Sequence, residues 1–142
     1  MKTILVPVDF SDVTTHLIDT VKTIASAIKA HVILLNVMAY TDVPMLAVQE
    51  AVMMRDVTKN YLVLNEFNKQ LEEAGVSSTI NQPQGSPVQT ILEESKKESV
   101  DMIVMGSHGH GAVYNLLVGS VSPGGQSAPP LGRIEGFKVH HL

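Results

Sequence analysis

A glycine-rich segment in the last third of the chain contains the residues best suited to binding chemistry. Gly106 and Gly109 are followed, after nine residues, by Gly119 and Ser120, and the segment begins directly after the apolar run Met102–Met105. Glycines at the end of a strand let the backbone approach a phosphate group and turn several N–H groups toward it. Ser120 adds a hydroxyl where the free N–H groups of a following helix favour an anion. The spacing therefore predicts a phosphate-binding loop, and a tight turn without a ligand is the alternative.

Other glycine-rich nucleotide motifs do not fit the chain. It contains no G-x-x-x-x-G-K-[ST] sequence, which excludes the usual P-loop. Gly109 and Gly111 are followed by Tyr114 at the position where a dinucleotide-binding fingerprint needs glycine or alanine. The loop is therefore neither of these two types.

Four polar side chains near the predicted strand ends or in the glycine-rich segment could take part in binding or catalysis. Asp9 ends the first apolar run, where it is either a helix-capping carboxylate or an acceptor for a ligand hydroxyl or amine. His108 and His110 have no carboxylate beside them, so a hydrogen bond from a neutral imidazole to a phosphate is favoured over a metal site. Ser120 has no base partner in the sequence, and no paired carboxylates lie near the loop, so no dedicated catalytic group is predicted.

The elements that must position these residues alternate regularly along the chain. Continuous apolar runs predict buried strands at residues 4–8, 32–38 and 102–105, and residues 76–80 predict a weaker strand at an edge of the sheet. Apolar residues at helical spacing predict a helix that follows an N-cap at Ser11 and runs to about residue 30, a second from about 46 to 74 and a third from 87 onward. Gly75 ends the second helix, and Ser86 and Pro87 begin the third. The inner face of the second helix is predicted to consist of Val57, Tyr61, Leu64, Phe67 and Leu71. Connections of this length build a parallel sheet with helices on both faces.

Size and composition limit the classes of function. A chain of 142 residues is long enough for one domain with a single core. The net charge of -4 argues against a protein that binds duplex nucleic acid, because such a protein needs a basic face. Cysteine is absent, which excludes disulfides, thiolate zinc sites and a cysteine nucleophile. The sequence contains no recognisable signal peptide and no apolar stretch of about 20 residues, so we expect a cytoplasmic protein without a membrane contact.

Three separated segments give the chain a resemblance to the nucleotide-binding universal stress proteins over residues 1–122. They are Ile4–Asp9, Gly85–Pro87, and the segment from Met105 to Val121 with its G-x2-G-x9-G-[ST] spacing. The resemblance implies an α/β three-layer sandwich with an open parallel sheet, of the adenine nucleotide alpha hydrolase-like type. It also implies the strand order 3-2-1-4, with a fifth strand in typical members, and a nucleotide across strands 1 and 4.

The same resemblance implies a ligand and the residues that hold it. The ligand is ATP or AMP, with Mg²⁺ bridging the phosphates. Asp9 and the backbone of Val37 would bind the base end of the nucleotide, and residues of the glycine-rich segment would bind the phosphates. The complete set of expected binding residues is Pro7, Val8, Asp9, Val37, Met105, Gly106, Gly109, His110, Gly119, Ser120 and Val121.

The resemblance implies a binding module for stress response or signalling. Two alternatives stay open: a nucleotide-free adaptor that works by protein contacts, and a slow ATP phosphohydrolase.

Residues 123–142 depart from the family pattern. Glycines and prolines (Gly124, Gly125, Pro129 and Pro130) occupy the positions of the usual last helix and fifth strand. This composition indicates either a frameshifted or recombinant tail or a divergent one, and we expect the fifth strand to be missing or irregular. A short strand at Phe137–Val139 is the alternative. Because the loss would uncover the apolar edge of residues 102–105, we expect a homodimer, either through a different surface from the usual one or weakened and with a mobile tail.

Overall fold

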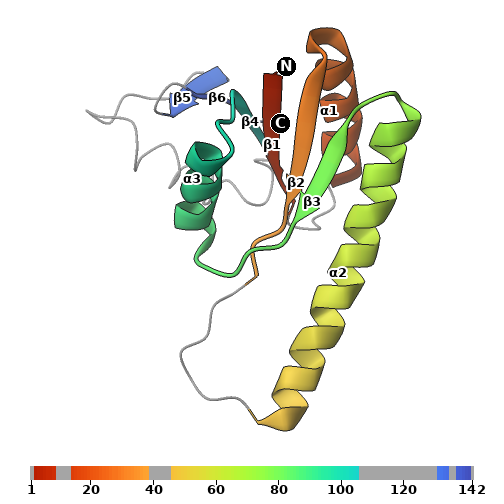
Figure 1. The fold of residues 1–142 in the computed structure, drawn as a ribbon, viewed down its shortest axis with the longest axis vertical. Coiled ribbons are helices and arrows are strands. Elements are labelled where there is room, and N and C mark those ends of the chain that lie inside the picture. Colours follow the sequence, from red (N-terminus) through yellow and green to blue (C-terminus); the bar gives the residue numbers. More distant parts are fainter. Residues whose placement is uncertain (1, 9–13, 39–45, 106–130, 135–136, 142) are drawn as a thin grey trace.

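The computed structural model describes residues 2–8, 14–38, 46–105, 131–134 and 137–141. Helices and strands alternate through most of this part of the chain (Figure 1). In chain order the elements are β1 (Lys2–Pro7), α1 (Thr14–Ile28), β2 (Ala30–Leu35), α2 (Ala47–Glu73), β3 (Ser78–Asn81), α3 (Pro87–Lys97), β4 (Met102–Met105), β5 (Leu131–Ile134) and β6 (Phe137–His141).

The strands form a single sheet in the order β3-β2-β1-β4-β6-β5. β1 pairs in parallel with β2 on one side and with β4 on the other, and β2 pairs in parallel with β3. The predicted α/β fold with the strand order 3-2-1-4 is therefore confirmed. The apolar runs of β1, β2 and β4 are continuous because these three strands are covered on both faces.

The prediction of a missing or irregular fifth strand is wrong. β6 pairs in parallel with β4 over four residue pairs, from Met102 with Lys138 to Met105 with His141, and β5 pairs antiparallel with β6. The physical reason is that residues 137–141 contain no glycine or proline, so every position can join a ladder. The edge of β4 is thus covered by the chain itself, which removes the reason given for a homodimer. The predicted breakers at residues 123–130 lie outside the described residues.

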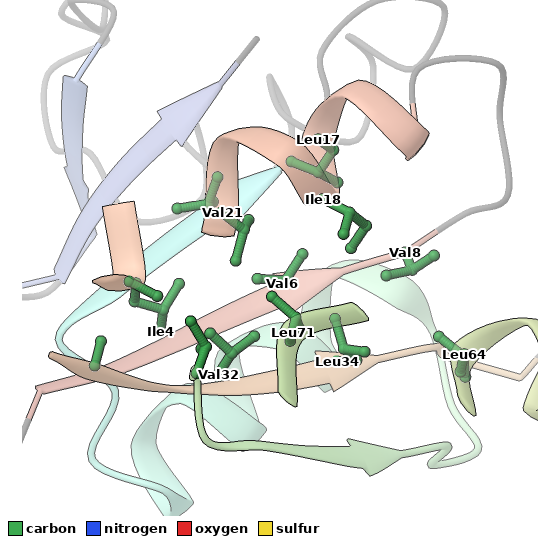
Figure 2. Packing of buried hydrophobic residues seen from close by; sticks show 14 residues of the cluster. Ile4, Val6, Val8, Leu17, Ile18, Val21, Val32, Leu34, Leu64 and Leu71 are labelled. Atoms are coloured by element: carbon green, nitrogen blue, oxygen red, sulfur yellow. The ribbon is translucent and has the colours of Figure 1, made fainter. Parts of the chain in front are cut away.

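Each face of the sheet has its own core, because successive side chains of a strand point to opposite faces. Ile4, Val6 and Val8 pack with the inner faces of α1 and α2, as Figure 2 shows. Leu5 packs on the other face with Ile91 of α3. The result is the predicted three-layer arrangement of helix, sheet and helix.

The helix α2 is longer than the part of the sheet that it covers. Leu64 and Leu71 are completely buried, but Tyr61, which was predicted to lie on the inner face, is 46% exposed. Figure 1 shows the amino-terminal half of α2 extending beyond the strands, so this half has no sheet to pack against. None of the helices in the described ranges is long and apolar enough to cross a membrane.

The two predicted helix boundaries at Gly75 and Pro87 are confirmed. Gly75 follows the end of α2 with a φ of +79°, a conformation that glycine adopts without strain. Pro87 is the first residue of α3. Ser86 precedes it, but its side chain makes no capping hydrogen bond; its carbonyl accepts the N–H of Thr90 at 2.9 Å.

Candidate functional site

The carboxyl ends of β1, β2 and β4 meet at one edge of the sheet, because all three strands run in parallel. Pro7, Leu35 and Met105 are the last residues of these strands. The chain places β2 and β3 on one side of β1 and β4 on the other, so the sheet changes its direction of growth between β1 and β4. Ligands of open α/β sheets bind at such a switch point.

β1 and β4 are paired over only part of their length. The ladder joins Ile4 to Met102 and Leu5 to Ile103, and it does not continue to the strand ends. The N–H of Thr3 donates to Asp101 and its carbonyl accepts from the same residue, which shows that odd-numbered residues of β1 turn their backbone groups toward β4. Pro7 is the next odd residue after Leu5, and it has no N–H to donate. The missing N–H of Pro7 therefore accounts for the end of the β1–β4 ladder before the switch point.

Asn36 follows the end of β2 and is, among the described residues, the polar side chain that lies buried at this edge next to β1. It is 7% exposed, and its Nδ2 donates to the Val8 carbonyl at 3.2 Å. Its Oδ1 is buried and has no hydrogen-bond partner among the described residues. A buried acceptor without a partner destabilises the fold, so it calls for a functional or structural reason.

The segment that follows β2 is hydrogen-bonded to the end of β3 and to the segment that follows β3, on the side away from β1. The N–H of Asn36 donates to the Asn81 carbonyl at 3.0 Å, and the N–H of Met38 donates to the Pro83 carbonyl at 2.8 Å. The Met38 carbonyl accepts the N–H of Gly85 at 2.9 Å. Val37 lies between these anchored residues, and within the described part of the chain its own N–H and carbonyl have no hydrogen-bond partner. Among the described residues, one donor and one acceptor at the site edge are therefore unpaired.

Four of the sequence-predicted site residues lie in the described part of the chain. Val8 and Met105 are each 4% exposed, and Val37 packs against the core on the α3 side. Their side chains, like that of Pro7, are apolar, so polar contacts with a ligand would come from the backbone at this edge. The other expected residues lie outside the described residues: Asp9, Gly106, Gly109, His110, Gly119, Ser120 and Val121.

Sequence reasoning did not identify Asn36 as a site residue. The signal was present, because Asn36 is a polar residue inside the apolar run that was predicted as a strand over 32–38. The strand itself covers Ala30–Leu35, so Asn36 stands at its carboxyl end. Among the described residues no group of three histidine, cysteine, aspartate or glutamate residues is placed to hold a metal ion.

Comparisons with known proteins agree with this geometry. The chain is 28% identical over 125 residues to a universal stress protein of Methanocaldococcus jannaschii, which covers 85% of this chain and 73% of the relative. A universal stress protein from Archaeoglobus fulgidus, solved in complex with dAMP, has a similar fold with a TM-score of 0.73 and 13% identity, over 99% of this chain and 97% of that one. A family protein from Arabidopsis thaliana with AMP bound matches with a TM-score of 0.66 and 18% identity, over 100% of this chain and 91% of that one.

The family model for the universal stress proteins matches residues 1–123. The match covers β1 to β4 and the three helices, together with the glycine-rich segment. The chain therefore belongs to the universal stress protein family.

Proposed function

We propose that this protein binds an adenine nucleotide, either AMP or ATP with Mg²⁺, across the carboxyl ends of β1 and β4. The observation that carries the proposal is the early end of the β1–β4 ladder at the switch point, directly before Gly106 of the glycine-rich segment. The base end would meet Asp9 and the free backbone groups of Val37. The phosphates would meet Gly106, Gly109, His110, Gly119, Ser120 and Val121. The relatives solved with AMP and dAMP support the choice of adenine.

The Mg²⁺ of the proposal would be held by the phosphates. The described residues offer no cluster of carboxylates or imidazoles for it, and the residues expected at the phosphates supply N–H groups and one hydroxyl. The role that follows is reversible binding in stress response or signalling, with hydrolysis at most a slow background reaction.

The test is the nucleotide content of the protein and its affinity in solution. Mass spectrometry of gently purified protein should detect AMP or ATP in about equimolar amount. Calorimetry should show one site per chain that binds AMP and ATP more tightly than GTP. A protein that carries no nucleotide and binds none at about 1 mM, which corresponds to roughly -4 kcal/mol, would contradict the proposal.

A second candidate, a nucleotide-free adaptor, is favoured by one observation. Seven of the eight large apolar side chains that are exposed in the described part of the chain lie between Leu46 and Val63. An exposed apolar surface of this kind is typical of protein contacts. A flat nucleotide titration on folded protein would favour this candidate, and turnover that depends on a named side chain would favour a phosphohydrolase.

The state of assembly is a separate proposal. We infer a homodimer through β5, because β5 is the outermost strand on its side of the sheet and an unpaired edge can accept a second copy. Sedimentation should show a dimer at micromolar concentration, and a stable monomer there would contradict it. A cytoplasmic location and the absence of nucleic-acid and membrane partners are proposed from the net charge of -4 and the composition.

A further inference from the structure

The side chain of Asn36 donates to a carbonyl, that of Val8, which in a regular sheet would accept the backbone N–H of Val37. The N–H of Val8 donates to the Leu35 carbonyl at 2.8 Å. In a regular parallel ladder the next bond would run from the Val37 N–H to the Val8 carbonyl, because alternate residues of a strand face the same neighbour. Here the Val8 carbonyl accepts from Asn36 Nδ2 at 3.2 Å instead.

The orientation of the Asn36 amide follows from this contact. A carbonyl oxygen can only accept, so the nitrogen of the amide must face Val8 and the oxygen must point away from it. That oxygen is buried without a partner in the described part of the chain. A valine or isoleucine would suit a buried position like this one better, because it leaves no unpaired polar atom. The amide therefore leaves one buried acceptor unpaired among the described residues, and it donates to the Val8 carbonyl where a regular ladder would have the Val37 N–H.

We propose that Asn36 is a positioning residue that keeps the backbone N–H and carbonyl of Val37 free for the base of a bound nucleotide. A purine with an amino group next to a ring nitrogen, as in adenine, offers a donor and an acceptor that match this pair. The inference rests on the proposed function and deepens it, because it assigns the recognition of the base to a side chain that does not itself touch the ligand.

The first test needs no ligand. In amide hydrogen exchange, the Val37 N–H of the wild-type protein should exchange at least tenfold faster than the N–H groups of Leu35 and Met38, which are both hydrogen-bonded. In Asn36→Val the Val8 carbonyl is released, and the Val37 amide should become protected by at least tenfold. Equal protection of Val37 and Leu35 in the wild-type protein would overturn the inference, whether or not the variant folds.

The second test measures recognition of the base. The wild-type protein should bind AMP about tenfold more tightly than purine riboside monophosphate, which lacks the amino group. Asn36→Val should bind AMP about tenfold more weakly and lose this preference. Asn36→Asp serves as a second variant, because it keeps the size of the side chain but cannot donate to Val8 when ionised. A variant that folds and keeps the full preference for AMP would overturn the inference.

Asn81→Val is the matched control. Asn81 is also a partly buried amide at the end of a neighbouring strand, and its Nδ2 donates to Glu94 at 2.9 Å. Its loss should lower stability without changing the exchange of Val37 or the preference for AMP. A wild-type protein that binds no AMP would contradict the proposed function alone, since the exchange experiment still decides the role of Asn36.

Discussion

The backbone of Gly85 lies directly against the side chain of Thr90, so that a Cβ atom added to Gly85 would overlap the Thr90 hydroxyl oxygen. Gly85 also has a φ of +155°, which other residues rarely adopt. The N–H of Gly85 donates to the Met38 carbonyl. Gly85 therefore links the segment after β2, by this hydrogen bond, to the first turn of α3, by its contact with Thr90. Glycine is therefore required at position 85 for two reasons: its φ angle is unfavourable for other residues, and there is no room for a Cβ atom.

The substitution Gly85→Ala should lower the free energy of unfolding by about 2 kcal/mol or more, since it adds both backbone strain and a steric overlap. Urea unfolding measures this loss. In a Thr90→Ala background the overlap is gone and only the strain remains, so the same substitution should cost less. An equal loss of unfolding free energy in the two backgrounds would show that Gly85→Ala does not cause a steric overlap with Thr90.

Two leucines on α2 should respond very differently to truncation. Leu71 is completely buried, so Leu71→Ala should lower the free energy of unfolding by about 2–5 kcal/mol. Leu62 is 63% exposed on the same helix, and Leu62→Ala should change it by less than about 0.5 kcal/mol. Thermal and urea unfolding of both variants check the difference. Similar losses would mean that the outer face of α2 is covered in solution.

Removal of β5 and β6 should expose the edge of β4. A chain that ends at Pro130 loses all four residue pairs between β4 and β6. We expect a lower melting temperature and, in place of the proposed dimer through β5, larger aggregates in sedimentation velocity, because an apolar open edge pairs with other chains. The full chain is the control. If both chains sediment alike and melt at the same temperature, the pairing of β6 with β4 does not stabilise the protein.

Pro7→Ala tests why the β1–β4 ladder ends early. The substitution restores an N–H that faces β4, so the ladder should extend and close the switch point. We expect AMP binding in calorimetry to weaken by about tenfold, while the free energy of unfolding changes by less than about 1 kcal/mol. Lys2→Ala, at the other end of β1 and exposed, is the control and should change neither quantity. An unchanged affinity of Pro7→Ala for AMP would show that Pro7 is not needed to keep the binding site open.

The alternation of strands and helices was predictable from the sequence, because the apolar runs and the helical patterns alternate and are separated by turn residues. The spatial order 3-2-1-4 followed from the resemblance to the universal stress proteins. Gly75 and Pro87 marked two helix boundaries for simple steric reasons. The strand at Phe137–His141 was harder to predict, since only Phe137 and Val139 of its five residues are apolar and the residues before it are rich in glycine and proline.

Local sequence patterns were also insufficient for two single residues. Tyr61 continues the apolar spacing of α2, but its exposure depends on where the sheet ends. Asn36 interrupts an apolar run by one residue, and only the neighbouring strand shows that its amide meets the Val8 carbonyl. At the site itself, the predicted roles of Pro7, Val8, Val37 and Met105 stay predictions.

The most direct test of the account is a titration of isotope-labelled protein with AMP, followed by backbone amide NMR. The account predicts that the largest shifts occur at the carboxyl edge of the sheet, at Val8, Asn36, Val37 and Met105. The amides of Lys2, His31 and Ser77, at the opposite edge, should move little. The absence of shifts at about 1 mM AMP on folded protein, or shifts centred on His31 and Ser77, would contradict a nucleotide site at the ends of β1 and β4.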